Sequence, residues 1–352
     1  MLFGIDKSEL RNITIESIDF EVLRRSSAIY NISNSDISLP VKLYKTEGYI
    51  KLDRLYIPDG ELFGTFTLDY KKEKTGRSYY TILDLTVKTK RARQHNLIPM
   101  SANKYRQKLI IIREYLIHNY GLYVSFTDSR LKSVELNITA EMDHTFESYK
   151  VLFEAIRQER NLKTYPYYVP LEKGLAYNTH YFYSKSQHLK FYNKTKELHD
   201  SFKIEVDDEL MRIEYTLIGF DRIKDRLGTD NPFELTDEAI ADFLNESIKE
   251  DVFKPIQKYI DKTDKKLTRK YKQIKKQYKR GFVREFAHYC NSKDADIFDM
   301  DQCISIVKKD MTKSASHNYS YNKKLIDSII SDSLKNNFAK YDEFKAKFQV
   351  KK

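Results

Sequence analysis

Apolar and polar residues alternate along much of the first hundred residues, with the two-residue period of β-strands. Four segments follow this pattern, namely 13–23, 48–57, 61–70 and 78–88. Turn-forming residues, including Pro58-Asp59-Gly60, separate them. Because strands that are joined by short turns pair antiparallel, the pattern predicts an antiparallel sheet in this part of the chain.

Helical spacing first appears after residue 100. Leu109, Ile112 and Leu116 recur at the helical period, between Ser101 in the N-cap position and Gly121 in the C-cap position. We therefore predict an α+β fold, in which helices pack on one face of an antiparallel sheet. The later strand patterns are 133–140, 176–183, 188–194 and 210–218, and a further helical pattern is 144–156.

The character of the chain changes near residue 220. From there on the pattern is helical, starting with 235–253. At 352 residues the chain is long enough for two domains that each bury a core. We expect one domain over 1–220, followed by a mostly helical, lysine-rich region over 221–352.

Basic residues outnumber acidic ones, with 62 Lys and Arg against 51 Asp and Glu, and the net charge is +11. This excess favours polyanionic partners, nucleic acid first and an anionic membrane surface second. The longest aliphatic run, 109–112, is far shorter than the roughly 20 residues of a membrane-spanning helix. The first residues also lack the pattern of a secretory signal peptide. We expect a cytoplasmic protein with a DNA partner and no membrane partner.

Several kinds of chemistry have no support in the sequence. The two cysteines, Cys290 and Cys303, cannot form a four-thiolate zinc site. The phosphate-binding motifs GxxxxGK[ST] and GxGxxG are missing, and so is the GxSxG motif of serine hydrolases. No two histidines flank a single residue, which excludes the class of nickase that holds its metal with a His-x-His strand.

Lysine is concentrated in 257–284, where 12 Lys or Arg stand against Asp261 and Asp264. So many like charges repel one another unless a polyanion or an acidic partner offsets them, although a solvated helix face would show a similar pattern. We expect this segment to contact DNA phosphates. The lysines assigned to this contact are Lys265, Lys266, Lys270, Lys272, Lys275 and Lys276.

Four predicted strands place apolar residues on one face and ionisable residues on the other. A solvated sheet face with cross-strand ion pairs is the ordinary explanation of such a pattern. The ionisable residues are Asp84 in 78–88, Glu135 in 133–140, Lys190, Tyr192 and Lys194 in 188–194, and Arg212 and Glu214 in 210–218.

Two of these segments resemble a known signature. The run YNKTKE (192–197) and the strand RIEYTLI (212–218) resemble the tyrosine motif and the Arg-x-Glu strand of rolling-circle replication initiators of small plasmids. The strand with Glu135 and the basic segment 86–97 are similar to parts of the gene II/X replication proteins of filamentous phages. The chain departs from the plasmid pattern at three positions, with Ser133 for Arg, Glu135 for Asp and Thr139 for a second Asp.

The resemblance implies an endonuclease that nicks one DNA strand at a plasmid or phage origin. A tyrosine attacks the phosphodiester and leaves a 5′-phosphotyrosyl enzyme and a 3′-OH that primes rolling-circle replication. Tyr192 is the implied nucleophile. Lys194 and, less directly, Lys190 would favour the phenolate or contact the scissile phosphate.

The resemblance also implies a divalent cation, Mg²⁺ or Mn²⁺, which carboxylate oxygens bind well. Glu135 and Glu214 are the expected ligands, while Asp84 and Glu197 compete for a third place. Arg212 either contacts a DNA phosphate or orients Glu214 through an ion pair.

The implied partners are origin DNA, both duplex and single-stranded, and the host helicase and polymerase. The helical region would bind the origin, recruit the helicase or form a homodimer. Two other interpretations stay open. One is a non-enzymatic DNA-binding regulator of replication or partition, and the other is a different tyrosine DNA-cleaving enzyme, such as a relaxase or a recombinase.

Overall fold

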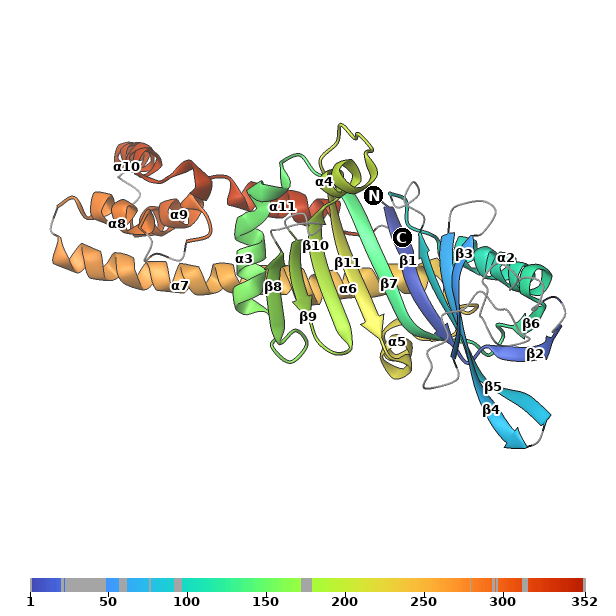
Figure 1. Ribbon diagram of the computed structural model, residues 1–352. Coiled ribbons are helices and arrows are strands. Elements are labelled where there is room, and N and C mark those ends of the chain that lie inside the picture. The colour runs from blue at the N-terminus through green and yellow to red at the C-terminus, as the bar shows by residue number, and fades with distance from the viewer. Residues whose placement is uncertain are drawn as a thin grey trace. The chain divides into compact units, whose positions relative to one another are not determined.

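The computed structural model describes residues 2–19, 22, 49–56, 62–75, 77–91, 97–171, 179–278, 280–292, 295, 297–311 and 316–350 (Figure 1). The chain divides into two compact units. The first comprises residues 1–140, 164–245 and 350–352, and the second comprises residues 141–163 and 246–349. The expected division at residue 220 differs from this one.

The first unit is built on an antiparallel sheet that has nine strands among the described residues, in the order β3-β4-β5-β1-β7-β11-β10-β9-β8 (Figure 1). Two short strands, β2 (Thr14–Ile18) and β6 (Leu122–Ser125), pair separately. The strands of the large sheet are β1 (Leu2–Arg11), β3 (Tyr49–Tyr56), β4 (Leu62–Thr75), β5 (Arg77–Arg91), β7 (Arg130–Glu141), β8 (Tyr167–Leu171), β9 (Thr179–Tyr183), β10 (Gln187–Asn193) and β11 (Leu210–Ile218). The predicted α+β fold is confirmed.

Helices α2 (Ala102–Tyr120) and α6 (Asp237–Ile248) cover the apolar face of this sheet. The hydroxyls of Ser8 on β1 and Tyr105 on α2 are joined by a 2.6 Å hydrogen bond. On the same face, the ring of Tyr215 on β11 packs edge-on against Phe243 of α6, with 5.5 Å between centroids. The predicted caps of α2 are confirmed, since Ser101 accepts a hydrogen bond from the third helical residue and Gly121 is left-handed at φ 63°.

The sequence pattern did not predict β1, which lies between β5 and β7 in the sheet. The predicted first strand, 13–23, corresponds only to β2 among the described residues. The pairing of β1 with β7 shifts between Ile5 and Lys7, so that Asp6 forms a bulge. An extra residue breaks the two-residue alternation, and this break hides the strand from a periodicity analysis.

The division into units follows the packing of α5 (Phe220–Leu227) and of α6 up to Asn245, which stay with the sheet. Arg130 of β7 forms an ion pair with Asp230, and the Leu131 amide donates to the Asp230 carbonyl at 2.7 Å. Asp237, the first residue of α6, accepts a 2.7 Å hydrogen bond from the amide of Ala102. These long-range contacts place residues 221–245 in the first unit, beyond the expected boundary.

Apart from Glu141, the last residue of β7, the described secondary structure of the second unit is helical, and its part after residue 245 falls in the region that was expected to be mostly helical. Helix α7 (Lys254–Gln277) presents a buried stripe, including Ile256, Ile260, Leu267 and Ile274, at the spacing of one helix face. Glu159 of α3 (Lys150–Glu159) forms ion pairs with Lys258 and Lys262 of α7. Its helices are η3 (Phe146–Tyr149), α3 (Lys150–Glu159), η6 (Lys249–Phe253), α7 (Lys254–Gln277), α8 (Phe282–Cys290), α9 (Met300–Asp310), α10 (Ser316–Ile329), η7 (Asp332–Leu334) and α11 (Asn337–Lys347).

Both cysteines, Cys290 and Cys303, are free thiols in the core of the second unit. Among the residues that the structure describes, no helix combines the length and the apolar character that a membrane crossing requires.

Candidate active site

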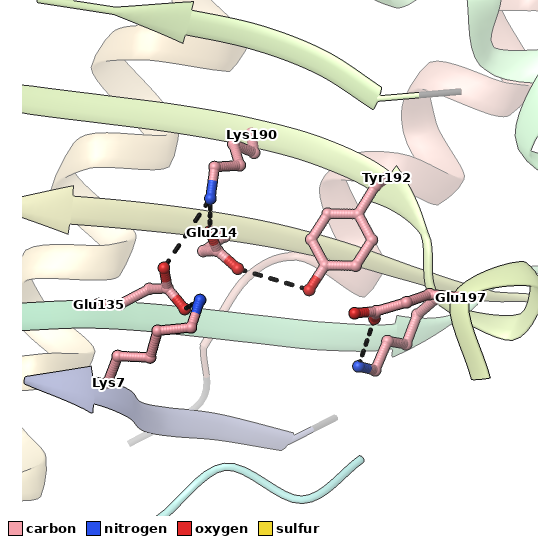
Figure 2. A network of polar contacts seen from close by, with 7 residues as sticks. Lys7, Glu135, Lys190, Tyr192, Glu197 and Glu214 are labelled. Carbon is pink, nitrogen blue, oxygen red and sulfur yellow. Dashed lines mark hydrogen bonds and ion pairs between the residues drawn. The ribbon is translucent and has the colours of Figure 1, made fainter. Parts of the chain in front are cut away.

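The polar face of the sheet gathers ionisable side chains from neighbouring strands (Figure 2). In the register of β10 and β11, Lys190 lies opposite Glu214 and Tyr192 lies opposite Arg212. Glu135 of β7 lies opposite Lys7 of β1. Because paired residues in an antiparallel sheet point to the same face, these strands bring their charged side chains into one cluster.

Three carboxylates of this cluster, those of Asp6, Glu135 and Glu214, have oxygens within 4.8 Å of one another. All three are buried, and such a group could hold a metal ion. Asp6 was missed by the sequence analysis because it belongs to the bulge in the unpredicted strand β1. The signal that could have found it is the pair Asp6-Lys7, which directly follows the apolar start of the chain.

The other two carboxylates expected near the metal are placed differently. Glu197 is not part of the three-carboxylate group and instead forms an ion pair with Lys194, with 2.5 Å between Nζ and Oε2. The side chain of Asp84 lies outside the residues that the structure describes, although its backbone pairs with Asp69 in β4.

Two lysines neutralise the carboxylates from the outer side of the face. Lys7 Nζ lies 2.6 Å from Glu135 Oε1. Lys190 contacts Glu214 directly and lies 3.8 Å from Glu135 Oε2 (Figure 2). The side chain of Lys7 is 38% exposed and that of Lys190 is 28% exposed. Both lysines are therefore more exposed than the carboxylates with which they pair.

The two glutamates differ in their affinity for a proton. Burial, together with the negative charge of Glu214, raises the pKa of Glu135 despite the nearby lysines. Burial also acts to raise the pKa of Glu214, but the charges of Lys190 and Lys7 outweigh it and lower that pKa. Glu214 is thus firmly ionised, whereas the nearby lysines do not fully compensate the negative charge of Glu135. A bound cation would supply the missing positive charge.

Tyr192 is the penultimate residue of β10 and is only 8% exposed. Its hydroxyl donates a hydrogen bond to Glu214 Oε2 at 3.4 Å, and Lys194 Nζ lies 5.9 Å from the centre of its ring. Burial raises the pKa of Tyr192 well above its ordinary value, although the charge of Arg212 opposes the shift. The side chain is therefore a neutral phenol in contact with the carboxylate cluster.

The predicted strand 188–194 ends one residue early, because α4 (Lys194–Glu197) begins at Lys194. Asn193 caps this helix, with its Oδ1 accepting a 2.8 Å hydrogen bond from the amide of Lys196. Lys194 is fully buried, and burial with the charge of Arg212 lowers its pKa to about 8. The turn from strand to helix thus places Lys194 beside the ring of Tyr192.

The guanidinium of Arg212 is fully buried, so it has no exposed surface for a DNA phosphate. Its Nε donates to Thr139 Oγ1 at 2.8 Å, and its Nη2 donates to the carbonyl of Leu97 at 2.9 Å. Of the two roles that the sequence left open for Arg212, its burial argues against a phosphate contact and favours a positioning role on this face.

The six lysines assigned to DNA lie on α7, in the second unit. Lys270 is half-buried, with its Nζ 4.9 Å from the ring of Tyr289, and Lys275 forms a 2.5 Å ion pair with Asp310. The exposed members of the set are Lys265, Lys266, Lys272, Lys275 and Lys276.

No protein-family model and no curated protein matches this sequence. Three chains of solved structures match this chain, among them the crystal structure of the di-domain ARO/CYC BexL from the BE-7585A biosynthetic pathway. That match has 8% sequence identity and a TM-score of 0.18, and it covers 71% of this chain and 97% of the BexL chain. A TM-score this low carries no argument, so the function has to be argued from the site itself.

The raised pKa of Glu135 predicts a specific dependence of stability on pH. The folded protein keeps this proton above the usual carboxyl pKa of 4.5, so folding loses stability as the pH rises from there through the raised pKa. Glu135→Gln cannot ionise. In chelator, its free energy of unfolding should therefore fall less than that of the wild type between about pH 5 and pH 8 in urea titrations.

Glu214→Gln is the matched control, with the opposite sign. In the wild type, the lowered pKa of Glu214 contributes stability that is present above the usual carboxyl pKa and is lost as the pH falls. This variant should lose about 1–3 kcal/mol at neutral pH, because Lys190 loses its closest partner. Equal pH profiles for the wild type and Glu135→Gln would contradict the assignment.

Proposed function

We propose that this protein is a metal-dependent DNA nickase that initiates rolling-circle replication at a plasmid or phage origin. The observation that carries the proposal is the contact of the Tyr192 hydroxyl with Glu214, one of three clustered carboxylates, on a sheet face lined by lysines. The sequence resemblance to plasmid and phage initiators supports the same nucleophile. A protein with this activity acts where the plasmid or phage DNA replicates, in the cytoplasm.

In this mechanism the phenolic oxygen of Tyr192 bonds to the phosphorus as the bond from phosphorus to the 3′ oxygen breaks. The phenol must lose its proton, and Glu214 Oε2, at 3.4 Å, is positioned to receive it. The 3′ oxygen leaves with the bonding electron pair and takes up a proton from solvent water, and so becomes the primer hydroxyl. Lys190, which is partly exposed, provides positive charge for the phosphate, while the buried Lys194 lies beside the Tyr192 ring and favours its phenolate.

The carboxylates of Asp6, Glu135 and Glu214 would hold the cation. Their hard oxygen ligands suit Mg²⁺ or Mn²⁺, and the raised pKa of Glu135 marks a deficit of positive charge there. When bound, such an ion neutralises charge that develops on the phosphoryl oxygens.

Tyr192→Phe tests the nucleophile. The change removes one hydroxyl and a long hydrogen bond, so the free energy of unfolding should change by only about 1 kcal/mol. Nicking of supercoiled or single-stranded origin DNA in Mg²⁺ or Mn²⁺ should fall on the order of a thousandfold or more, and the covalent 5′ adduct should disappear. Denaturing gels of end-labelled DNA measure both effects.

Tyr215→Phe is the control, because Tyr215 is also buried but lies on the opposite face of the sheet, on β11. Nicking by Tyr192→Phe at the wild-type rate would remove the tyrosine mechanism. Salt-dependent DNA binding without any cleavage by the wild type would instead favour the non-enzymatic regulator.

The metal ligands are tested by Asp6→Asn, Glu135→Gln and Glu214→Gln. Each change removes one charged ligand while keeping the shape of the side chain, so each should weaken Mn²⁺ binding in calorimetry by at least about tenfold. DNA binding should be largely retained. Glu205→Gln is the control, because Glu205 is 82% exposed and outside the group. Wild-type Mn²⁺ affinity in all three variants would place the ligands elsewhere.

The second unit is proposed to bind duplex DNA through α7. Among the described residues, neither Lys272 nor Lys276 has an ion-pair partner, and the two lie one helical turn apart. Replacing both with Gln should weaken binding to all DNA sequences alike, and it should lower the salt slope by about 0.9 for each phosphate that is no longer neutralised. Filter binding or anisotropy over a series of salt concentrations measures the slope.

The control for this test is the pair Lys323 and Lys324, which are exposed on α10. A change in slope that is equal in the two double variants, or missing in both, would mean that α7 is a solvated or protein-binding face. Origin recognition would then have to be sought in 86–97 or in the later helices.

A further inference from the structure

A row of aromatic side chains continues from the carboxylate cluster toward the edge of the sheet, on the same face. In the register of β9 and β10, Tyr181 lies opposite Lys190 and Tyr183 lies opposite His188. On the edge strand β8, Tyr167 lies opposite Tyr183. Since Lys190 contacts Glu214, the row starts where the candidate active site ends.

The rings of this row are in contact with one another. Tyr181 and Tyr183 stack with 4.9 Å between centroids, and Tyr183 and Tyr167 stack with 5.1 Å between centroids. His188 meets Tyr181 edge-on at 5.4 Å, and Lys190 Nζ lies 5.8 Å from the centre of the Tyr181 ring. The result is a continuous aromatic surface with one ammonium group at its inner end.

This surface does not belong to the hydrophobic core. On the opposite face of the same strands, Phe182, Leu189 and Phe191 are almost completely buried and supply the packing. The row itself is accessible, since Tyr167 is 55% exposed and Tyr181 and Tyr183 are half-buried. Cross-strand aromatic pairs stabilise a sheet slightly, by about 0.2–1 kcal/mol each, but they do not require an accessible row that ends at a catalytic cluster.

Accessible aromatic rings beside positive charge suit an unpaired nucleic acid strand, whose bases stack on rings while its phosphates contact lysine. The turn between β9 and β10 adds the exposed Lys185 at the outer end of the row. Successive residues on one face of a strand are about 6.6–6.8 Å apart, so the row spans a few nucleotides from Tyr192. A duplex has its bases paired and stacked and cannot use these rings.

We propose that Tyr181, Tyr183 and Tyr167 form a base-stacking platform that holds single-stranded DNA beside Tyr192. The inference rests on the proposed function, because it identifies the strand on the platform as the one that Tyr192 cuts. The stacking is independent of base identity, so the platform positions the strand and leaves origin recognition to other surfaces.

The test measures how tightly the full chain binds a fluorescein-labelled oligothymidylate of about 15 nucleotides. Binding is monitored by fluorescence anisotropy in a buffer that contains a metal chelator. Tyr167→Leu and Tyr183→Leu should each weaken binding roughly 5- to 100-fold, whereas Tyr167→Phe and Tyr183→Phe should bind like the wild type. Tyr123→Leu is the control, because Tyr123 is 42% exposed on β6 and outside the row. Thermal melts of all variants identify any that unfold, and rescue by Phe separates stacking from the loss of side-chain volume.

Cleavage assays separate this proposal from the proposed function. If the wild type nicks DNA and the Leu variants raise KM for single-stranded DNA with little change in kcat, both proposals are supported. If the wild type nicks DNA while the Leu variants bind and cleave as it does, the platform is wrong and the nickase stands. If the wild type does not nick DNA but the Leu variants lose oligothymidylate binding, the platform stands as a single-strand site and the nickase is wrong. An equal loss of duplex and single-strand binding would overturn the platform.

Discussion

The antiparallel register of β1, β7, β11 and β10 fixes which side chains share a face, and most of the first unit depends on it. Lys190 lies opposite Glu214 and Lys7 lies opposite Glu135, while Phe191 lies opposite Ile213 on the other face. A shift of one residue in any of these strands would move its ionisable side chains into the core and its apolar ones into solvent. The same pairing that buries the core therefore assembles the candidate active site, and stability and site geometry are not separable in these strands.

Charge balance is the second constraint on the site. Burying a carboxylate is costly unless cations and hydrogen bonds compensate it, and here three carboxylates lie within 4.8 Å of one another. Lys7 and Lys190 supply part of that compensation from the partly exposed side. These ammonium groups lie at the ends of long, flexible side chains. They can therefore move away from a bound cation or turn toward a phosphate without disturbing the backbone. The site therefore combines three buried carboxylates with two flexible, partly exposed lysine side chains.

The two units divide the chemistry between them. The first unit holds the carboxylates, the tyrosine and the aromatic row on one sheet face, for which we propose an unpaired DNA strand as the ligand. The second unit presents α7, whose buried stripe packs against its own core, including Phe286, Val307 and Ile326, while most of its lysines face solvent. A charged helix face contacts phosphates regardless of sequence, and a sheet face that stacks bases is equally tolerant. Specific recognition of an origin would require additional contacts to base edges.

Local patterns in the sequence determined the elements whose periodicity is unbroken. Strand β11, helix α2 with its caps, and the polar faces that carry Glu135, Tyr192 and Glu214 follow from alternation and capping residues alone. Only the tertiary structure revealed β1 and Asp6, because a bulge interrupts the alternation there. It also decided that α3 packs with α7 and that Arg212 is buried on Thr139, since both depend on contacts between residues far apart in the chain. Periodicity shows on which face of a strand or helix a residue lies. The partners of that residue depend on pairing between segments far apart in the chain, and the local pattern of residues does not reveal such pairing.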